Sequence, residues 1–132
     1  MKISVHAEVL NLLPTIRLGT ISATINCEPS SNEFIASIDD LAGEIRDQYN
    51  LEEIKNHEVI ASTRNAYKKF GNDPNRYRPS ADALLRRIVK DSDLYRINNV
   101  VDTLNLISIQ SGFSIGGYDA DKIEDSIEIG NW

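Results

Sequence analysis

The sequence predicts an α+β fold, with strands near the two ends of the chain and about four packed helices between them. Apolar residues recur at every second position near the ends and at every third or fourth position in the middle, which are the periods of strands and helices. The chain has 132 residues, of which 41% are hydrophobic and 26% are charged. This is the size and composition of one soluble domain with one hydrophobic core, so we expect a single domain over residues 1–132.

Three segments have the alternating pattern of strands. Residues 3–9 alternate between apolar and polar side chains, as a half-buried strand does. Residues 21–27 alternate in the same way and are rich in β-branched side chains. A third strand begins at residues 127–129, close to the end of the sequence at Trp132. We expect this last strand to lack a partner within the chain, which indicates either a fragment or a partner chain that supplies the missing strand.

The first two helices are predicted in the middle of the chain. Residues 35–49 carry apolar side chains at helical spacing. A turn is predicted over residues 51–57, and a second helix follows over residues 60–70, with Gly71 placed to end it. Arg64 is expected on the side of this helix that faces away from the core.

The third and fourth helices follow a loop with two prolines, residues 72–79, which is incompatible with regular structure. Ser80 is predicted to cap the third helix, which buries a stripe of leucine, isoleucine and valine side chains. The fourth helix is predicted to be capped by Asn98 or Asn99 and to end at Gly112.

Several classes of protein are excluded by the composition. The N-terminal segment lacks the apolar stretch of a signal peptide and no run is long enough to span a membrane, so we expect a cytoplasmic protein without a membrane partner. The single Cys27 allows neither an intrachain disulfide nor a multi-cysteine metal site. His6 and His57 lack metal-ligand spacing, so neither a metal nor another cofactor is predicted. No nucleophilic triad or phosphate-binding glycine loop is present, and the catalytic residues stay unknown.

The charges are distributed unevenly along the chain. The net charge of −6 argues against a nucleic acid partner when taken alone. However, residues 64–96 contain nine of the 14 Lys and Arg residues and only four acidic residues. The rest of the chain has five basic and 16 acidic residues. The sequence therefore contains one basic segment in an otherwise acidic protein.

Four arginines of this segment and the tyrosine among them are predicted to bind RNA. Guanidinium groups match phosphate oxygens, and an aromatic ring can stack on a base. The alternative is a solvated face with local ion pairs, from Arg78 to Asp82 or from Arg76 to Asp73. The residues of the predicted RNA-binding surface are Arg76, Tyr77, Arg78, Arg86 and Arg87.

Three stretches carry a resemblance to a known family. They are RNAYKKFGNDPNRYRPSADALLRR (64–87), RINNVVDTLNLISIQSG (96–112) and IGGYDADKI (115–123). In this order and spacing, over residues 64–123, the chain resembles the B3/B4-type domain of the phenylalanyl-tRNA synthetase beta chain. The first sixty residues are compatible with the family but less diagnostic.

The resemblance implies a fold and a function. The family's fold is a β-sandwich with helices packed against it. In the synthetase, this domain is an editing module that hydrolyses a tyrosyl group wrongly attached to the phenylalanine tRNA, so the resemblance implies tRNA binding and a role in translation. The family's domain continues beyond the end of this sequence, which implies that the C-terminal part of the domain is lacking here.

A substrate pocket is also implied by the resemblance. Arg96 lies at or one place from an arginine that lines the family's pocket, and the helix after it carries the family's V-V-D-x-x-N pattern. Gly116 stands where many synthetase editing domains have a histidine. The alternatives are a helix cap for Asn98, a structural acid for Asp102 and an ordinary turn for the glycines. The residues placed at the pocket are Arg96, Asn98, Asp102, Asn105, Gly116 and Gly117.

Three functions follow as hypotheses. The first is a tRNA-binding module that acts as a trans-acting aminoacyl-tRNA deacylase. The second is a module that binds RNA or a free amino acid without catalysis, and Gly116 favours it because glycine cannot relay a proton. The third is an acidic protein-interaction module that self-associates or accepts a partner strand at its C-terminal edge.

Overall fold

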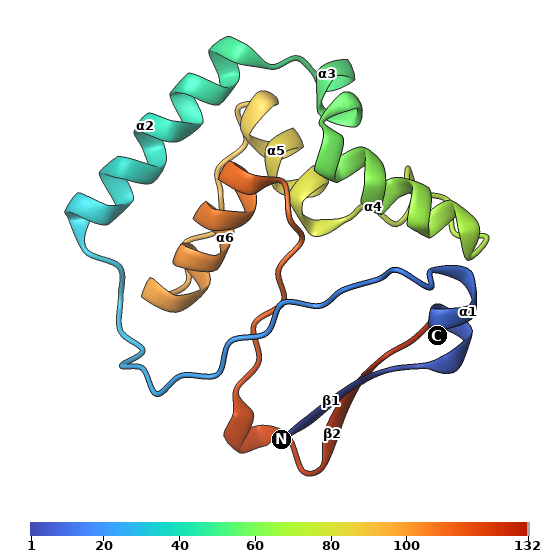
Figure 1. Cartoon of the computed structure of the whole chain (residues 1–132). Coiled ribbons are helices and arrows are strands. Elements are labelled where there is room, and N and C mark those ends of the chain that lie inside the picture. Colours follow the sequence, from blue (N-terminus) through green and yellow to red (C-terminus); the bar gives the residue numbers. More distant parts are fainter. Residues whose placement is uncertain (132) are drawn as a thin grey trace.

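The computed structural model describes residues 1–131 and shows two groups of elements (Figure 1). Helices α2 to α6 lie together, and two short strands with helix α1 lie apart from them. The predicted α+β fold is confirmed. The elements in chain order are β1 (Lys2–Val5), α1 (Ala7–Leu12), α2 (Asn32–Gln48), α3 (Leu51–Asn56), α4 (Glu58–Lys69), α5 (Ser80–Val89), α6 (Asn99–Ser111), a 3-10 turn (Ala120–Lys122) and β2 (Ser126–Ile129).

The two strands form a parallel pair that joins the ends of the chain. Lys2 lies opposite Ser126, and Val5 lies opposite Ile129. In the described chain, all six α-helices lie between the two strands in the sequence, which fits the long crossover that a parallel pair needs. The expectation that the last strand lacks a partner within the chain was therefore wrong. Within residues 1–131 the sheet has only these two strands, so the sandwich implied by the resemblance does not form there.

Of the two strands predicted near the N-terminus, one is shorter than expected and the other does not form. The first strand ends at Val5 because His6 caps a helix, its side chain accepting a hydrogen bond from the Glu8 amide. The second predicted strand, residues 21–27, is absent, and residues 16–31 have no regular secondary structure. A strand needs a neighbouring strand to pair its backbone N–H and C=O groups, and no described strand lies beside this segment. Its side chains are not buried either, since Ile21 is 97% exposed.

The helix boundaries follow local capping chemistry. Ser31 caps α2 by accepting a hydrogen bond from the Phe34 amide at 3.1 Å. The segment predicted to be a turn, residues 51–57, contains α3 instead, because Asn50 and Glu53 form a reciprocal capping box.

Three of the later helix ends were predicted correctly. Asn98 caps α6 through the Val101 amide at 2.9 Å, and Gly112 ends this helix with a φ of 78°. Gly71 follows α4 with a φ of 76°. Ser80 was expected to be a cap, but it is the first residue of α5 and Pro79 holds the cap position. Proline pre-sets the backbone for a helix start but offers no side-chain acceptor.

Helix α5 is the centre of the core. It packs against α2, α3 and α6, and the apolar stripe predicted for it is buried. The burial of this stripe provides the main hydrophobic stabilisation of the helical part. The buried apolar residues of this core are Ala42, Ile45, Ile54, Ile60, Ala81, Leu85, Ile88 and Ile109.

A buried ion-pair network ties α4 to α5. Asp82 is fully buried and its two carboxylate oxygens accept hydrogen bonds from Arg64 and Arg86, both at 2.6 Å. Arg64 also donates to the Pro74 carbonyl at 3.2 Å and to the Asn75 side chain at 2.7 Å. Arg64 was expected to face away from the core. It is buried because the loop after α4 and the start of α5 together provide an anion and two neutral acceptors for its guanidinium.

We expect Gly112→Ala to lower the free energy of unfolding by about 1 to 3 kcal/mol, because an L side chain is strained at this positive φ. The added methyl would also lie 2.5 Å from a His57 ring carbon. The matched control is Gly43→Ala inside α2, where the methyl meets no atom within 4 Å. This change should raise stability by about 0.5 to 1 kcal/mol. Urea unfolding of both variants checks the prediction, and equal effects of the same sign would contradict it.

Candidate functional site

The structure divides the predicted RNA-binding arginines into two groups. Arg86 lies on the last turn of α5, but its side chain turns back to Asp82 and is 12% exposed. Arg87, its neighbour, donates from Nε and Nη2 to the carbonyl oxygen of Asp93, at 3.1 and 2.6 Å. Both guanidinium groups are therefore engaged by the chain itself.

The other group lies in the loop before α5 and is exposed. Arg76, Tyr77 and Arg78 all face solvent, and the Arg76 guanidinium lies 5.2 Å from the centre of the Tyr77 ring. The alternative ion pairs from Arg78 to Asp82 and from Arg76 to Asp73 do not form. In the described part of the chain, Arg78 makes neither a hydrogen bond nor an ion pair.

Two lysines add to this exposed group. Lys68 and Lys69 lie in the last turn of α4, directly before the loop, and both are exposed. Neither forms an ion pair with any described residue. We call Lys68, Lys69, Arg76, Tyr77 and Arg78 the basic surface. Its four cations are free to bind a phosphate backbone.

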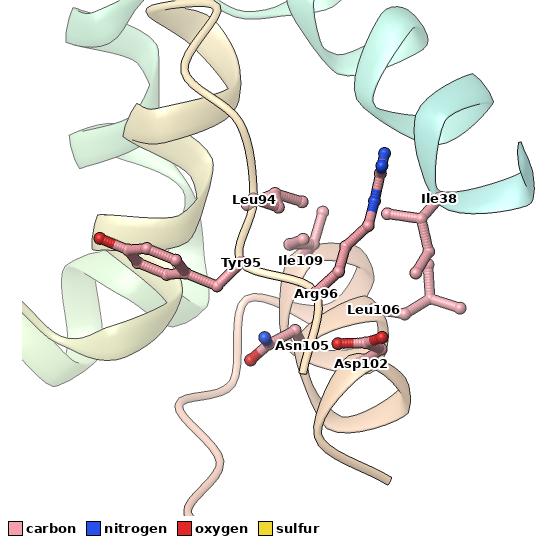
Figure 2. Close-up of a pocket in the computed structure, with 8 residues that line it drawn as sticks. All are labelled: Ile38, Leu94, Tyr95, Arg96, Asp102, Asn105, Leu106 and Ile109. Atoms are coloured by element: carbon pink, nitrogen blue, oxygen red, sulfur yellow. The ribbon is translucent and has the colours of Figure 1, made fainter. Parts of the chain in front are cut away.

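A small pocket lies between α2, α6 and the segment that connects α5 to α6 (Figure 2). Its cavity volume is only about 10 Å³, room for about one water molecule, and it is partly open to solvent. That volume is below the range of about 300 to 1,000 Å³ that is usual for small-molecule sites. The pocket brings together three of the residues placed there by the resemblance, which are Arg96, Asp102 and Asn105. The other lining residues are Ile38, Leu94, Tyr95, Leu106 and Ile109.

Two of the three polar groups in the pocket already have partners. Asp102 is buried and accepts hydrogen bonds from the Ser30 hydroxyl at 2.6 Å and from the Ile97 amide at 3.0 Å. Arg96 extends towards α2, where it forms an ion pair with Asp39 (Figure 2). The carboxylate therefore holds together the two segments that precede α2 and α6, and the guanidinium is engaged at the surface.

Asn105 is the exception among these groups. Its side-chain amide forms no hydrogen bond with any residue in 1–131, although the residue is half-buried on α6. An amide offers both donors and an acceptor. The hydrogen-bonding capacity of the Asn105 amide is therefore unused within residues 1–131.

The remaining predicted pocket residues lie outside the pocket lining. Asn98 is the cap of α6, as its structural alternative stated. Gly116 and Gly117 are exposed in the chain that follows α6. A methyl on Gly117 would lie 2.6 Å from Leu104, so this glycine allows the chain to pack closely on α6.

Two residues make contacts that the sequence did not predict. The Asn99 side chain accepts a hydrogen bond from the Glu28 amide and donates one to the Asn26 carbonyl, both at 3.0 Å. These bonds anchor the irregular segment before α2 to α6. Tyr95 is exposed in the pocket wall, with the guanidinium of Arg87 4.4 Å from its ring centre. The two consecutive asparagines at the start of α6 were a signal for the Asn99 contacts. One asparagine is enough to cap the helix, which leaves the side chain of the other free to bind another segment.

Neither a metal centre nor a membrane span is found among the described residues. Within residues 1–131, no three His, Cys, Asp or Glu side chains are grouped in a way that could hold a metal ion. The helices of this part of the chain are all too short or too polar to cross a bilayer.

Comparison with known proteins identifies the family. The family model of the B3/4 domain matches residues 62–131, just over half of the chain and the region that includes both the basic surface and most of the pocket. Searches of curated proteins and of solved structures found no significant match. The chain belongs to the B3/4 domain family, which makes it a module related to phenylalanyl-tRNA synthetase.

Proposed function

We propose that this chain is an RNA-binding module whose partner is a tRNA. The observation that carries the proposal is the basic surface, which lies inside the region matched by the B3/4 family. Its four cations have no ion-pair partners among the described residues, whereas Arg64, Arg86 and Arg96 are paired with acids. A phosphate backbone would supply the missing anions and would release its counterions on binding.

The charge distribution favours contact at the basic surface. The net charge is −6, so most of the protein surface repels a polyanion, whereas four cations without ion pairs lie within residues 68–78. Tyr77 lies within the basic surface with 54% of its area exposed, and its ring can stack on an unpaired base. A tRNA partner would place the protein in the cytoplasm, in translation.

The basic surface predicts a specific salt dependence of tRNA binding. The logarithm of the affinity should fall linearly with the logarithm of salt concentration, by about 0.7 to 0.9 per phosphate contact. The double variant Arg76→Ala with Arg78→Ala should reduce this slope by about 1.4 to 1.8. Filter binding with total tRNA across a salt titration measures both quantities.

The matched control removes the same charge elsewhere. Arg17 and Lys122 are exposed and lie outside the basic surface, so Arg17→Ala with Lys122→Ala should leave the slope unchanged. Equal reductions in both double variants would show that only net charge matters. No binding by the wild-type protein at low salt would refute the RNA function.

A second candidate function is hydrolysis of an aminoacyl ester on the bound tRNA. It is favoured by the pocket, which brings Arg96, Asp102 and Asn105 together. The pocket provides no nucleophile, so a water positioned by the ribose hydroxyls would attack the ester carbonyl, and the ribose oxygen would leave as a free hydroxyl of the tRNA end. Gly116 and Gly117 lie outside the pocket lining, so other groups would have to donate to the carbonyl oxygen.

Hydrolysis has its own test. If the chain edits, the wild-type protein should release tyrosine from tyrosylated phenylalanine tRNA faster than buffer alone, and Arg96→Ala and Asn105→Ala should each slow the release. Release at the buffer rate would refute the editing function and leave RNA binding standing. The salt titration and the release assay together separate the two functions.

A further inference from the structure

Residues 17–25 form a long stretch of chain whose backbone makes no hydrogen bond with any residue in 1–131. The stretch contains neither a turn nor a bend, and every residue from 17 to 29 is exposed. In Figure 1 it lies on the path that crosses the molecule from α1 to α2. Unpaired backbone N–H and C=O groups along such a chain are a template for a further strand.

Both ends of this stretch are held in place. At the first end, the Ile16 amide donates a hydrogen bond to the Leu13 carbonyl at 3.1 Å. At the other end, the Asn99 side chain on α6 binds the Asn26 carbonyl and the Glu28 amide, both at 3.0 Å. Because the ends are anchored, a partner strand has less chain entropy to overcome than it would on a free loop.

The contacts of Asn99 also determine which edge of the stretch is open. In an extended chain, the N–H and C=O groups of one residue point to one edge and those of the next residue point to the opposite edge. Asn26 and Glu28 direct these groups to Asn99, so the even-numbered residues before them face α6. The odd-numbered residues from Gly19 to Cys27 therefore direct their N–H and C=O groups to the open edge.

The sequence of the stretch is complementary to itself in the antiparallel direction. When Ala23 lies opposite Ala23 of a second copy, Ile21 of each copy lies opposite Ile25 of the other. On the other face, Ser22 of each copy lies opposite Thr24 of the other. Apolar side chains thus meet apolar ones and hydroxyls meet hydroxyls, and both are favourable cross-strand pairs.

Charge also favours a second copy as the partner. Residues 18–27 contain no charged side chain, although the protein as a whole carries a net charge of −6. Two copies therefore repel each other over most of their surfaces, but they meet no like charges along this stretch. A strongly charged partner would find no counter-charge there.

We propose that two copies of this chain associate by pairing residues 19–27 as antiparallel strands about a twofold axis at Ala23. A shift of one residue would place Ile21 opposite Thr24, so the pattern selects this register. Ile21 is 97% exposed and Ile25 is 58% exposed in the single chain, and each gains an apolar neighbour. Pairing stops at two copies because the other edge faces α6. The proposal does not depend on RNA binding.

Sedimentation equilibrium tests the dimer, with the full chain at about 1 to 300 µM because one strand pair is a small interface. The wild-type protein should show a reversible monomer–dimer equilibrium. Ala23→Pro should raise the dimer Kd by at least about tenfold, because proline lacks the N–H that each copy donates in the central pair. Circular dichroism should show a folded monomer, since residues 17–25 make no backbone hydrogen bond in the single chain.

The matched control places proline at the next position. The Thr24 amide points to the edge that faces α6, so it makes no hydrogen bond to the second copy. Thr24→Pro should therefore leave the dimer Kd within about threefold of the wild-type value, because proline is tolerated where its missing N–H is not needed.

Disulfide formation tests the register. Ser22→Cys and Thr24→Cys are made separately, each with Cys27→Ser. Residues 22 and 24 of opposite copies form a pair without mutual hydrogen bonds, with Cα atoms about 4.5 Å apart, which is within disulfide range. An oxidised mixture of the two variants should form a covalent dimer. Either variant alone should form little, because identical positions lie about 7 to 8 Å apart on the diagonal.

Three results would overturn the proposal. If the wild-type protein stays monomeric over the whole range, the stretch does not pair with a second copy and is left for a strand of another protein. If Ala23→Pro dimerises as the wild type does, another surface forms the dimer. If either cysteine variant alone cross-links as fast as the mixture, the strands pair in a different register.

Discussion

The buried carboxylate of Asp82 is the interaction on which the arrangement of α4, α5 and the loop between them depends. Two guanidinium groups converge on it, and both would be left without a counter-ion in the core if it were absent. The network carries one more positive than negative charge. The Pro74 carbonyl and the Asn75 side chain offset part of that excess by accepting hydrogen bonds from Arg64. One terminal nitrogen of Arg86 is buried without a partner among the described residues. The position of the loop is thus set by the requirements of a buried charge.

The same network determines which basic residues reach solvent. Residues 76–78 follow directly after the two loop residues that Arg64 holds, so the buried network also fixes the basic surface. Most polar groups of the pocket are likewise used by the chain itself, since Asp102 holds two segments together and Arg96 binds Asp39. Of the residues predicted from the sequence to bind RNA, only Arg76, Tyr77 and Arg78 are left exposed.

Local signals in the sequence were sufficient for the features that depend on a few neighbouring residues. The cap at Asn98 and the helix end at Gly112 were predictable because capping chemistry acts within one turn. Long-range contacts were not predictable in this way. Arg64 appeared to lie on an outer face because nothing near it in the sequence indicates a buried acid 18 residues away. The strand pattern of residues 21–27 was misleading because alternation provides no pairing partner. The contact between the Tyr95 ring and the Arg87 guanidinium was not predictable, because the two residues lie in different segments whose relative position the sequence does not show.

A double-mutant cycle on Asp82 and Arg64 tests the central claim that the two residues form one buried charge network that holds α4, α5 and the loop together. Urea unfolding would be measured for Asp82→Asn, Arg64→Ala and the double variant. Asp82→Asn should cost about 3 to 5 kcal/mol, because it leaves two buried guanidinium groups without their counter-ion. Arg64→Ala should cost less, because Asp82 keeps its ion pair with Arg86. The double variant should cost less than the sum of the two by about 1 to 3 kcal/mol, the size of coupling found within one ion-pair network. Losses that add to within about 0.5 kcal/mol would show that the two residues act independently, and would contradict the account.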